Sequence, residues 1–143
     1  PQGYLRSGLR WLRQHPWHFT KLTITGESLP YVNTPELARQ RFFSPDTPEA
    51  LVRRYAARLQ EESSRSGLDG LVMLPRPDRV RAPVLVLGAL EDGAVTREEV
   101  RATARAYRTE SVFFPGMGHN LMLEPDWETV AHRIDDWLIT LGL

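Results

Sequence analysis

Two residues suited to acid–base chemistry each follow a short apolar run in the second half of the sequence. Asp92 comes four residues after the run Pro83–Gly88, and His119 comes five residues after the run Ser111–Phe114. If both runs are parallel strands, these residues lie at the strands' carboxyl ends, where α/β proteins gather ligands and catalytic groups. A carboxylate bound to one imidazole nitrogen fixes the tautomer, which makes the other nitrogen available as a base. The spacing therefore predicts an acid–histidine pair.

The loops around these two residues leave alternatives open. Gly116 and Gly118 allow a tight turn that can hold the His119 imidazole over the strand ends. Glu91, beside Asp92, is a rival for the acid, and only the direction of the side chains separates the two. Asp and His are also common in solvated loops, so both residues can be incidental to function. A partner at hydrogen-bond distance distinguishes these interpretations.

The second half of the chain has the pattern of a parallel α/β unit. Pro83–Gly88 is a nearly unbroken apolar run rich in β-branched residues, typical of a strand buried on both faces. Thr96 and Glu99 form a capping box that begins a helix, and Ser111–Phe114 predicts a second strand. A closing helix is expected before Gly142, and its apolar stripe consists of Trp127, Val130, Ala131, Ile134, Leu138 and Leu141.

The first half is expected to be helical. A stripe of leucines at positions 5, 9 and 12 predicts a helix that His15-Pro16 ends, and the stretch that follows has the composition of irregular structure. Thr34-Pro35 and Thr47-Pro48 each combine an N-cap hydroxyl with a proline at the first helical position. The second of these helices extends its apolar face to Leu59. We therefore divide the chain into a helical segment, residues 1–74, and a strand-helix-strand-helix unit, residues 75–143.

Composition excludes several classes of function. The 143 residues carry 18 basic and 18 acidic side chains, so no net charge favours a nucleic-acid partner. No apolar run approaches the roughly 18 residues of a membrane span. Cysteine is absent, which removes disulfides and thiolate chemistry and favours the cytoplasm. His15 and His18 are interrupted by Pro16 and lack a third ligand, so no metal and no cofactor is expected.

The second half resembles the C-terminal end of an α/β-hydrolase. The resemblance covers roughly residues 80–140 and includes the run Pro83–Gly88 leading to Asp92, the segment Phe113–His119, and the final helix. In that family the chain order is nucleophile, acid, histidine. The resemblance implies that Asp92 is the triad acid and His119 the triad base, and that residues 1–74 form the helical cap over the substrate pocket. Glu124, which follows Leu121-Met122-Leu123, is placed to cap or brace the turn that contains His119.

One element of the family is missing from the sequence. No G-x-S-x-G nucleophile elbow occurs, and Ser7 and Ser66 lack both its paired glycines and its preceding strand. The chain begins at Pro1 without Met. We therefore expect the C-terminal portion of an esterase-like serine hydrolase, from a GC-rich bacterial genome, whose nucleophile and oxyanion hole lie upstream. The chain alone should then be inactive, and the aromatic side chains of the cap suit an apolar ester-like substrate.

Two other functions remain open. One is a non-catalytic binding or assembly module, and the other is a dehalogenase or haloperoxidase of the same fold with a different nucleophile. In each case two strands alone leave unpaired edges. These edges predict a homo-oligomer or a strand-sharing dimer of this chain.

Overall fold

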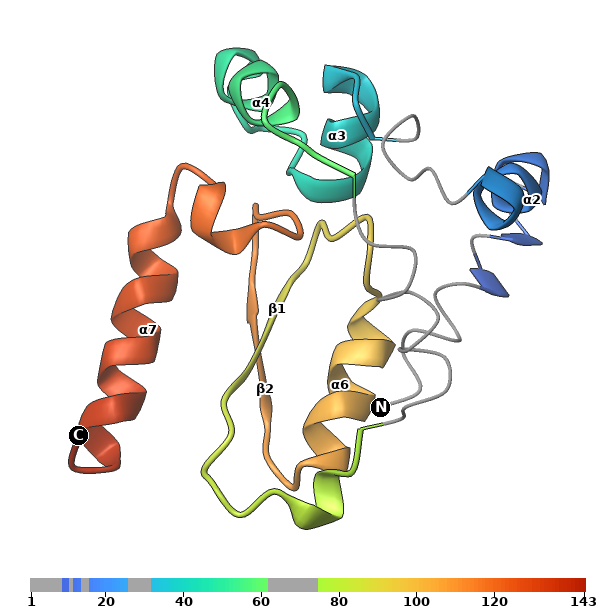
Figure 1. The fold of residues 1–143 in the computed structure, drawn as a ribbon. Helices are drawn as coiled ribbons and strands as arrows, with labels where there is room; N and C mark the ends of the chain where they lie inside the picture. Colours follow the sequence, from blue (N-terminus) through green and yellow to red (C-terminus); the bar gives the residue numbers. More distant parts are fainter. Residues whose placement is uncertain (1–8, 11, 14–15, 26–31, 62–74) are drawn as a thin grey trace.

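The structure is a computed structural model that describes residues 9–10, 12–13, 16–25, 32–61 and 75–143. These residues form a mixed α/β fold around a two-stranded parallel sheet (Figure 1). No helix in these ranges is long and apolar enough to cross a membrane. The elements in chain order are α2 (Pro16–Thr25), α3 (Pro35–Phe42), α4 (Glu49–Ala56), η2 (Pro77–Arg79), β1 (Val86–Ala89), α6 (Arg97–Ala106), β2 (Ser111–Phe114), η3 (Leu121–Leu123) and α7 (Trp127–Thr140).

The two strands pair in a register that brings their carboxyl ends level. Val86 pairs with Ser111 and Ala89 pairs with Phe114. Helix α6 connects the strands, as a parallel pair requires a crossover. In Figure 1, α6 covers one face of the sheet and α7 lies on the other. The predicted strand-helix-strand-helix order is confirmed.

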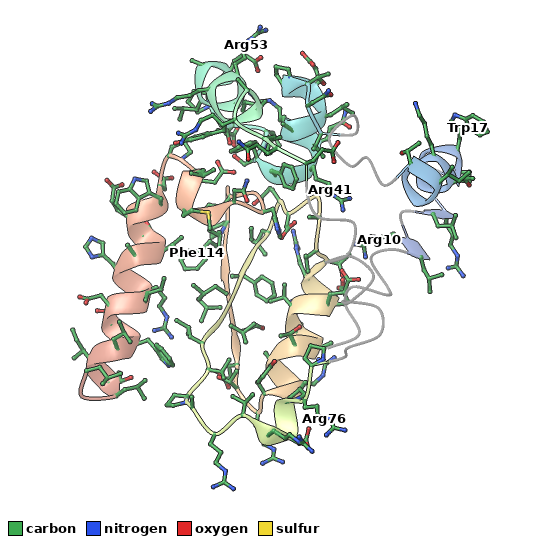
Figure 2. The ribbon with its side chains drawn as sticks, viewed as in Figure 1. Arg10, Trp17, Arg41, Arg53, Arg76 and Phe114 are labelled. Atoms are coloured by element: carbon green, nitrogen blue, oxygen red, sulfur yellow. The ribbon has the colours of Figure 1, made fainter. Side chains whose placement is uncertain are left out.

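Alternate residues of the strands supply two apolar clusters, one on each face. The cluster on the α6 face contains Val86, Val100 and Ala104, with Val84, Val95 and Phe113 packed against it. The cluster on the α7 face contains Ala89, Phe114, Met117 and Val130, with Leu87, Val112 and Leu121 beside it. Figure 2 shows Phe114 on the side of the sheet that faces α7. The sheet is therefore packed on both faces, as the apolar run of the first strand predicts.

A third apolar cluster belongs to the helical segment and lies beyond the carboxyl ends of the strands (Figure 1). Its buried members are Ala38, Phe43, Val52 and Ala56, with Phe42, Tyr55, Leu59 and Leu123 packed against them. Leu123 comes from η3, which directly follows the turn that contains His119. The helices α3 and α4 and the histidine turn therefore share one core.

The sequence prediction was wrong about the stretch after Pro16. It was expected to be irregular, yet residues 16–25 form α2 with Pro16 at its start, a position where a missing N–H costs nothing. The hydroxyls of Thr20 and Thr25 donate to the carbonyls of Pro16 and Lys21 within the same helix. Trp17 is 76% exposed on α2 (Figure 2). Of the leucine-striped helix predicted before it, residues 9–10 and 12–13 are helical and the rest lies outside the described residues.

One predicted boundary is confirmed and three differ. Thr34 caps α3 as expected, because its hydroxyl accepts a hydrogen bond from the N–H of Leu37. The N-cap of α4, however, is Pro48, and the Thr47 hydroxyl bonds elsewhere. Helix α4 ends at Ala56, and Leu59 packs from the turn beyond it. The first strand is Val86–Ala89 and not Pro83–Gly88, because pairing covers only the four residues that face the second strand.

The apolar stripe of α7 is only partly covered. Val130 is buried, whereas Trp127, Ile134 and Leu141 are 47%, 38% and 39% exposed. Gly142 follows the helix with a φ of 75°, as expected for a residue that ends it. Within the described part of the chain, one side of α7 therefore lacks an apolar partner.

The capping box at the start of α6 gives a direct test of local stability. The Thr96 hydroxyl accepts from the N–H of Glu99, and the Glu99 carboxylate accepts from the N–H of Thr96. Thr96→Ala should lower the free energy of unfolding by about 1 kcal/mol, because a backbone N–H of the first turn loses its acceptor. Urea denaturation measures the change, and Thr96→Ser is the matched control that keeps the hydroxyl. Equal losses in both variants would contradict the capping role.

Candidate functional site

Asp92 lies in a loop that continues the pairing of the two strands. After β1, the N–H of Leu90 donates to the carbonyl of Phe114 at 3.0 Å, and the N–H of Glu91 donates to the carbonyl of Met117 at 3.1 Å. These bonds hold the loop after β1 against the loop after β2. The chain then turns, and Asp92 Oδ1 accepts from the N–H groups of two residues beyond it, Ala94 at 2.7 Å and Val95 at 2.9 Å. Asp92 thus stabilises its own turn and leaves its second oxygen to face the neighbouring loop.

His119 meets that second oxygen. Its Nδ1 lies 2.9 Å from Asp92 Oδ2, with the Asp92 side chain 7% exposed and the His119 side chain 37% exposed. Because an ionised carboxylate only accepts hydrogen bonds, Nδ1 carries the proton and Nε2 of the neutral ring holds a lone pair. No other described residue hydrogen-bonds to the ring. The two residues singled out from the sequence are therefore brought together in the geometry of a base and the group that orients it.

The environment of Asp92 favours its ionised form. Burial alone would raise the pKa of Asp92, but the hydrogen bond from His119 and those from the N–H groups of Val95 and Ala94 outweigh burial, and the pKa is lowered. The carboxylate is therefore ionised across the neutral range. It can stabilise a protonated His119 ring without taking its proton.

Glu91, the rival acid, points elsewhere. Its carboxylate accepts from the N–H of Met117 at 3.1 Å and so joins the two loops, while Asp92 alone bonds to His119. The side-chain direction that the sequence leaves open is thereby resolved in favour of Asp92 as the histidine's partner.

The backbone on both sides of His119 is held in place. Before it, the N–H of Gly118 donates to Glu124 Oε1 at 2.8 Å; after it, the N–H of Asn120 donates to the carbonyl of Phe42 at 3.0 Å. The Phe42 ring lies beside the imidazole, with centroids 6.1 Å apart and planes tilted by 39°. Since Phe42 ends α3, the helical segment forms one wall around the imidazole.

Glu124 braces the histidine turn as expected, but most of its contacts were not foreseen. Besides Gly118, it bonds to the N–H and hydroxyl of Ser44 and to the hydroxyl of Thr47. In the sequence, Thr47-Pro48 has the signature of an N-cap, which gave no sign of this longer-range contact. The position of Glu124 just after Leu121-Met122-Leu123 indicated only that it lies near the turn that contains His119.

Arg10 is a residue that sequence reasoning missed. Its guanidinium donates to the carbonyl of Ala94 at 3.0 Å and to Glu99 Oε1 at 2.9 Å (Figure 2). Burial raises the pKa of Glu99, but hydrogen bonds from the Thr96 N–H and from Arg10 outweigh it, and the pKa is lowered. Arg10 therefore fastens the helical segment to the turn that Asp92 stabilises.

The other titratable candidates lie apart from this pair. His132 is exposed on α7, His15 lies outside the described residues, and nothing is described of the His18 side chain. Within residues 9–10, 12–13, 16–25, 32–61 and 75–143, no three His, Asp or Glu side chains group into a metal site. Ser7 and Ser66 also lie outside the described residues.

Comparison with known proteins gives no further assignment. No family model matches the chain, and no curated protein and no solved structure is significantly similar to it. The interpretation of the site therefore depends on its residues and their geometry.

The lowered pKa of Asp92 predicts a pH-dependent contribution to stability. A carboxyl whose folded-state pKa lies below its unfolded value, about 3.9, stabilises the fold above that value and loses this contribution as the pH falls through the folded pKa. The difference in unfolding free energy between the wild type and Asp92→Asn that this carboxyl contributes should therefore be fully present at about pH 5 and above, and shrink as the pH falls towards about pH 2. Urea denaturation across this range measures the difference. Asp135→Asn, on the exposed side of α7, is the control. A difference that does not vary with pH would contradict the prediction.

Proposed function

We propose that this chain is the C-terminal portion of an α/β-hydrolase that hydrolyses ester, thioester or amide bonds. In this proposal Asp92 is the triad acid, His119 is the triad base, and residues 1–74 are the cap. The observation that carries the proposal is the 2.9 Å hydrogen bond between His119 Nδ1 and Asp92 Oδ2 at the carboxyl ends of adjacent parallel strands. The chain order, acid before histidine, is that of the α/β-hydrolases.

The chemistry follows from the tautomer that Asp92 imposes. His119 Nε2 accepts the proton of the nucleophile's hydroxyl while the nucleophile's oxygen bonds to the substrate carbonyl carbon. The protonated ring then gives this proton to the leaving alcohol, thiol or amine as its bond to carbon breaks. In the second half of the cycle Nε2 takes a proton from water, which attacks the acyl-enzyme, and returns it to the nucleophile. The ionised Asp92 stabilises the charged imidazolium in both halves.

The nucleophile and oxyanion hole are assigned to a part of the protein outside these 143 residues. Ser44 and Thr47, whose hydroxyls bond to Glu124 beside the histidine turn, are each 1% exposed, so neither hydroxyl can attack a substrate. The uncovered apolar side of α7 and the two strand edges are consistent with further strands and helices in the complete protein.

The substrate class is inferred from the cap. Phe42 presents an aromatic ring beside the imidazole, and an apolar acyl or aryl group fits against such a surface. We therefore propose small apolar esters as substrates.

The test uses the complete protein that contains this chain. An organophosphonate probe should label its nucleophile, and p-nitrophenyl esters should be hydrolysed. Asp92→Asn should lower kcat about 10⁴-fold, because the amide stabilises the wrong tautomer, and His119→Gln should lower it at least as much. His132→Gln is the matched control and should leave the rate unchanged. Full activity in Asp92→Asn and His119→Gln, or ester hydrolysis by the isolated 143-residue chain, would overturn the proposal.

A further inference from the structure

Glu124 is an unusual residue to find in an apolar core. It directly follows η3, is 1% exposed, and is the largest of the fully buried side chains among the described residues. Burying a carboxylate is costly unless hydrogen bonds replace its hydration. The hydrogen bonds that Glu124 accepts must therefore replace the water that its carboxylate loses on burial.

Its partners come from two separate parts of the chain. Oε1 accepts from the N–H of Ser44 at 2.6 Å and from the N–H of Gly118 at 2.8 Å. Oε2 accepts from the hydroxyl of Thr47 at 2.5 Å and from the hydroxyl of Ser44 at 3.2 Å. Three of the four donors thus belong to the helical segment, and the fourth directly precedes His119.

Two further contacts join the same parts. The N–H of Asn120, which directly follows His119, donates to the carbonyl of Phe42. A Cβ on Gly118 would lie only 2.4 Å from the carbonyl carbon of Phe43, so the two backbones are in direct contact. Both neighbours of His119 in the chain are therefore held against residues 42–47.

We propose that Glu124 is a positioning residue that couples the cap to the catalytic base: it ties residues 42–47 to the histidine turn, so that His119 keeps its hydrogen bond with Asp92 only while this part of the cap is docked. The catalytic part of this statement rests on the proposed function, whereas the coupling does not. Loss of any donor in residues 42–47 then weakens the hydrogen bond between His119 and Asp92, although Ser44 and Thr47 do not themselves bond to the imidazole.

The pattern of donors gives this proposal a specific signature. The two groups that face Oε1 are backbone N–H groups, which only donate, whereas the two that face Oε2 are hydroxyls, which can rotate and accept. A glutamine at position 124 can place its carbonyl on the N–H side and its NH₂ group on the hydroxyl side, and so keep all four bonds. Alanine keeps none of them: the N–H groups of Ser44 and Gly118 lose their acceptor, and of the two hydroxyls, 3.0 Å apart, only one can still donate to the other.

The experiment observes the His119 ring in the ¹⁵N-labelled 143-residue chain by NMR. The wild type should give a downfield Nδ1–H resonance, assigned by its loss in Asp92→Asn. The resonance should be lost in Glu124→Ala, retained in Glu124→Gln, and shifted or weakened in Thr47→Val. Thr103→Val is the matched control, because the Thr103 hydroxyl bonds only within α6, to the carbonyl of Glu99; it should leave the resonance unchanged.

Each result decides the proposal. The proposal is overturned if the wild type lacks the Nδ1–H resonance, or if Glu124→Ala folds and keeps the resonance unchanged. If Glu124→Ala does not fold, an unchanged resonance in Thr47→Val overturns the proposal instead. In the complete protein, Glu124→Ala should lower kcat about 10- to 100-fold with rescue by Glu124→Gln. A wild type that hydrolyses no ester, but whose ring responds as expected, would refute the proposed function and leave the coupling intact.

Discussion

The parallel pairing of β1 with β2 is the interaction on which the rest of the described structure depends. Its register places Ala89 beside Phe114, and backbone bonds from Leu90 and Glu91 continue the alignment into the two loops. A slip of one residue would move one loop by about 3.3 Å relative to the other and reverse the faces of its strand. A hydrogen bond does not survive such a displacement. The meeting of Asp92 and His119 is thus set by backbone pairing before any side chain contributes.

Two buried carboxylates attach the helical segment to this frame. The Glu99 carboxylate accepts hydrogen bonds from the Arg10 guanidinium and from the N–H of Thr96. The Glu124 carboxylate accepts hydrogen bonds from the N–H of Ser44, the hydroxyl of Thr47 and the N–H of Gly118 in the histidine turn. No buried polar side-chain atom among the described residues lacks a hydrogen-bond partner. Apolar contacts such as those around Phe43 favour burial but do not fix the orientation of the packed elements, because the hydrophobic effect is non-directional. The charged hydrogen bonds, in contrast, specify which loop packs against which helix.

The sequence was informative where structure is decided locally. The run before Gly88, the capping box at Thr96 and the segment Ser111–Phe114 carry patterns of hydrogen bonding or periodicity that few alternatives satisfy, and parallel topology then brings Asp92 near His119. The division into two parts at residue 75 stays a prediction, as do the catalytic roles.

The remaining features depend on contacts between distant residues. The hydroxyl of Thr47 can either cap a helix or donate to a distant carboxylate such as that of Glu124. The sequence around Thr47 does not distinguish these two roles, and the structure shows the second. Arg10 lies 84 residues from the carbonyl it binds, so no local pattern identifies it. Glu91 and Asp92 are adjacent in a loop without periodicity, which is why their directions became known only from the structure.

The glycines of the two loops meet the same short stretch of the helical segment. A Cβ on Gly93 would lie 1.9 Å from the carbonyl oxygen of Gln40, and one on Gly118 would lie 2.4 Å from the carbonyl carbon of Phe43. The stretch from Gln40 to Thr47 therefore contacts both loops, and its length sets the distance between the two contact points. An insertion or deletion within it would displace one loop relative to the other. Changes in the length of the helical segment should therefore disturb the two loops less when they fall outside these eight positions.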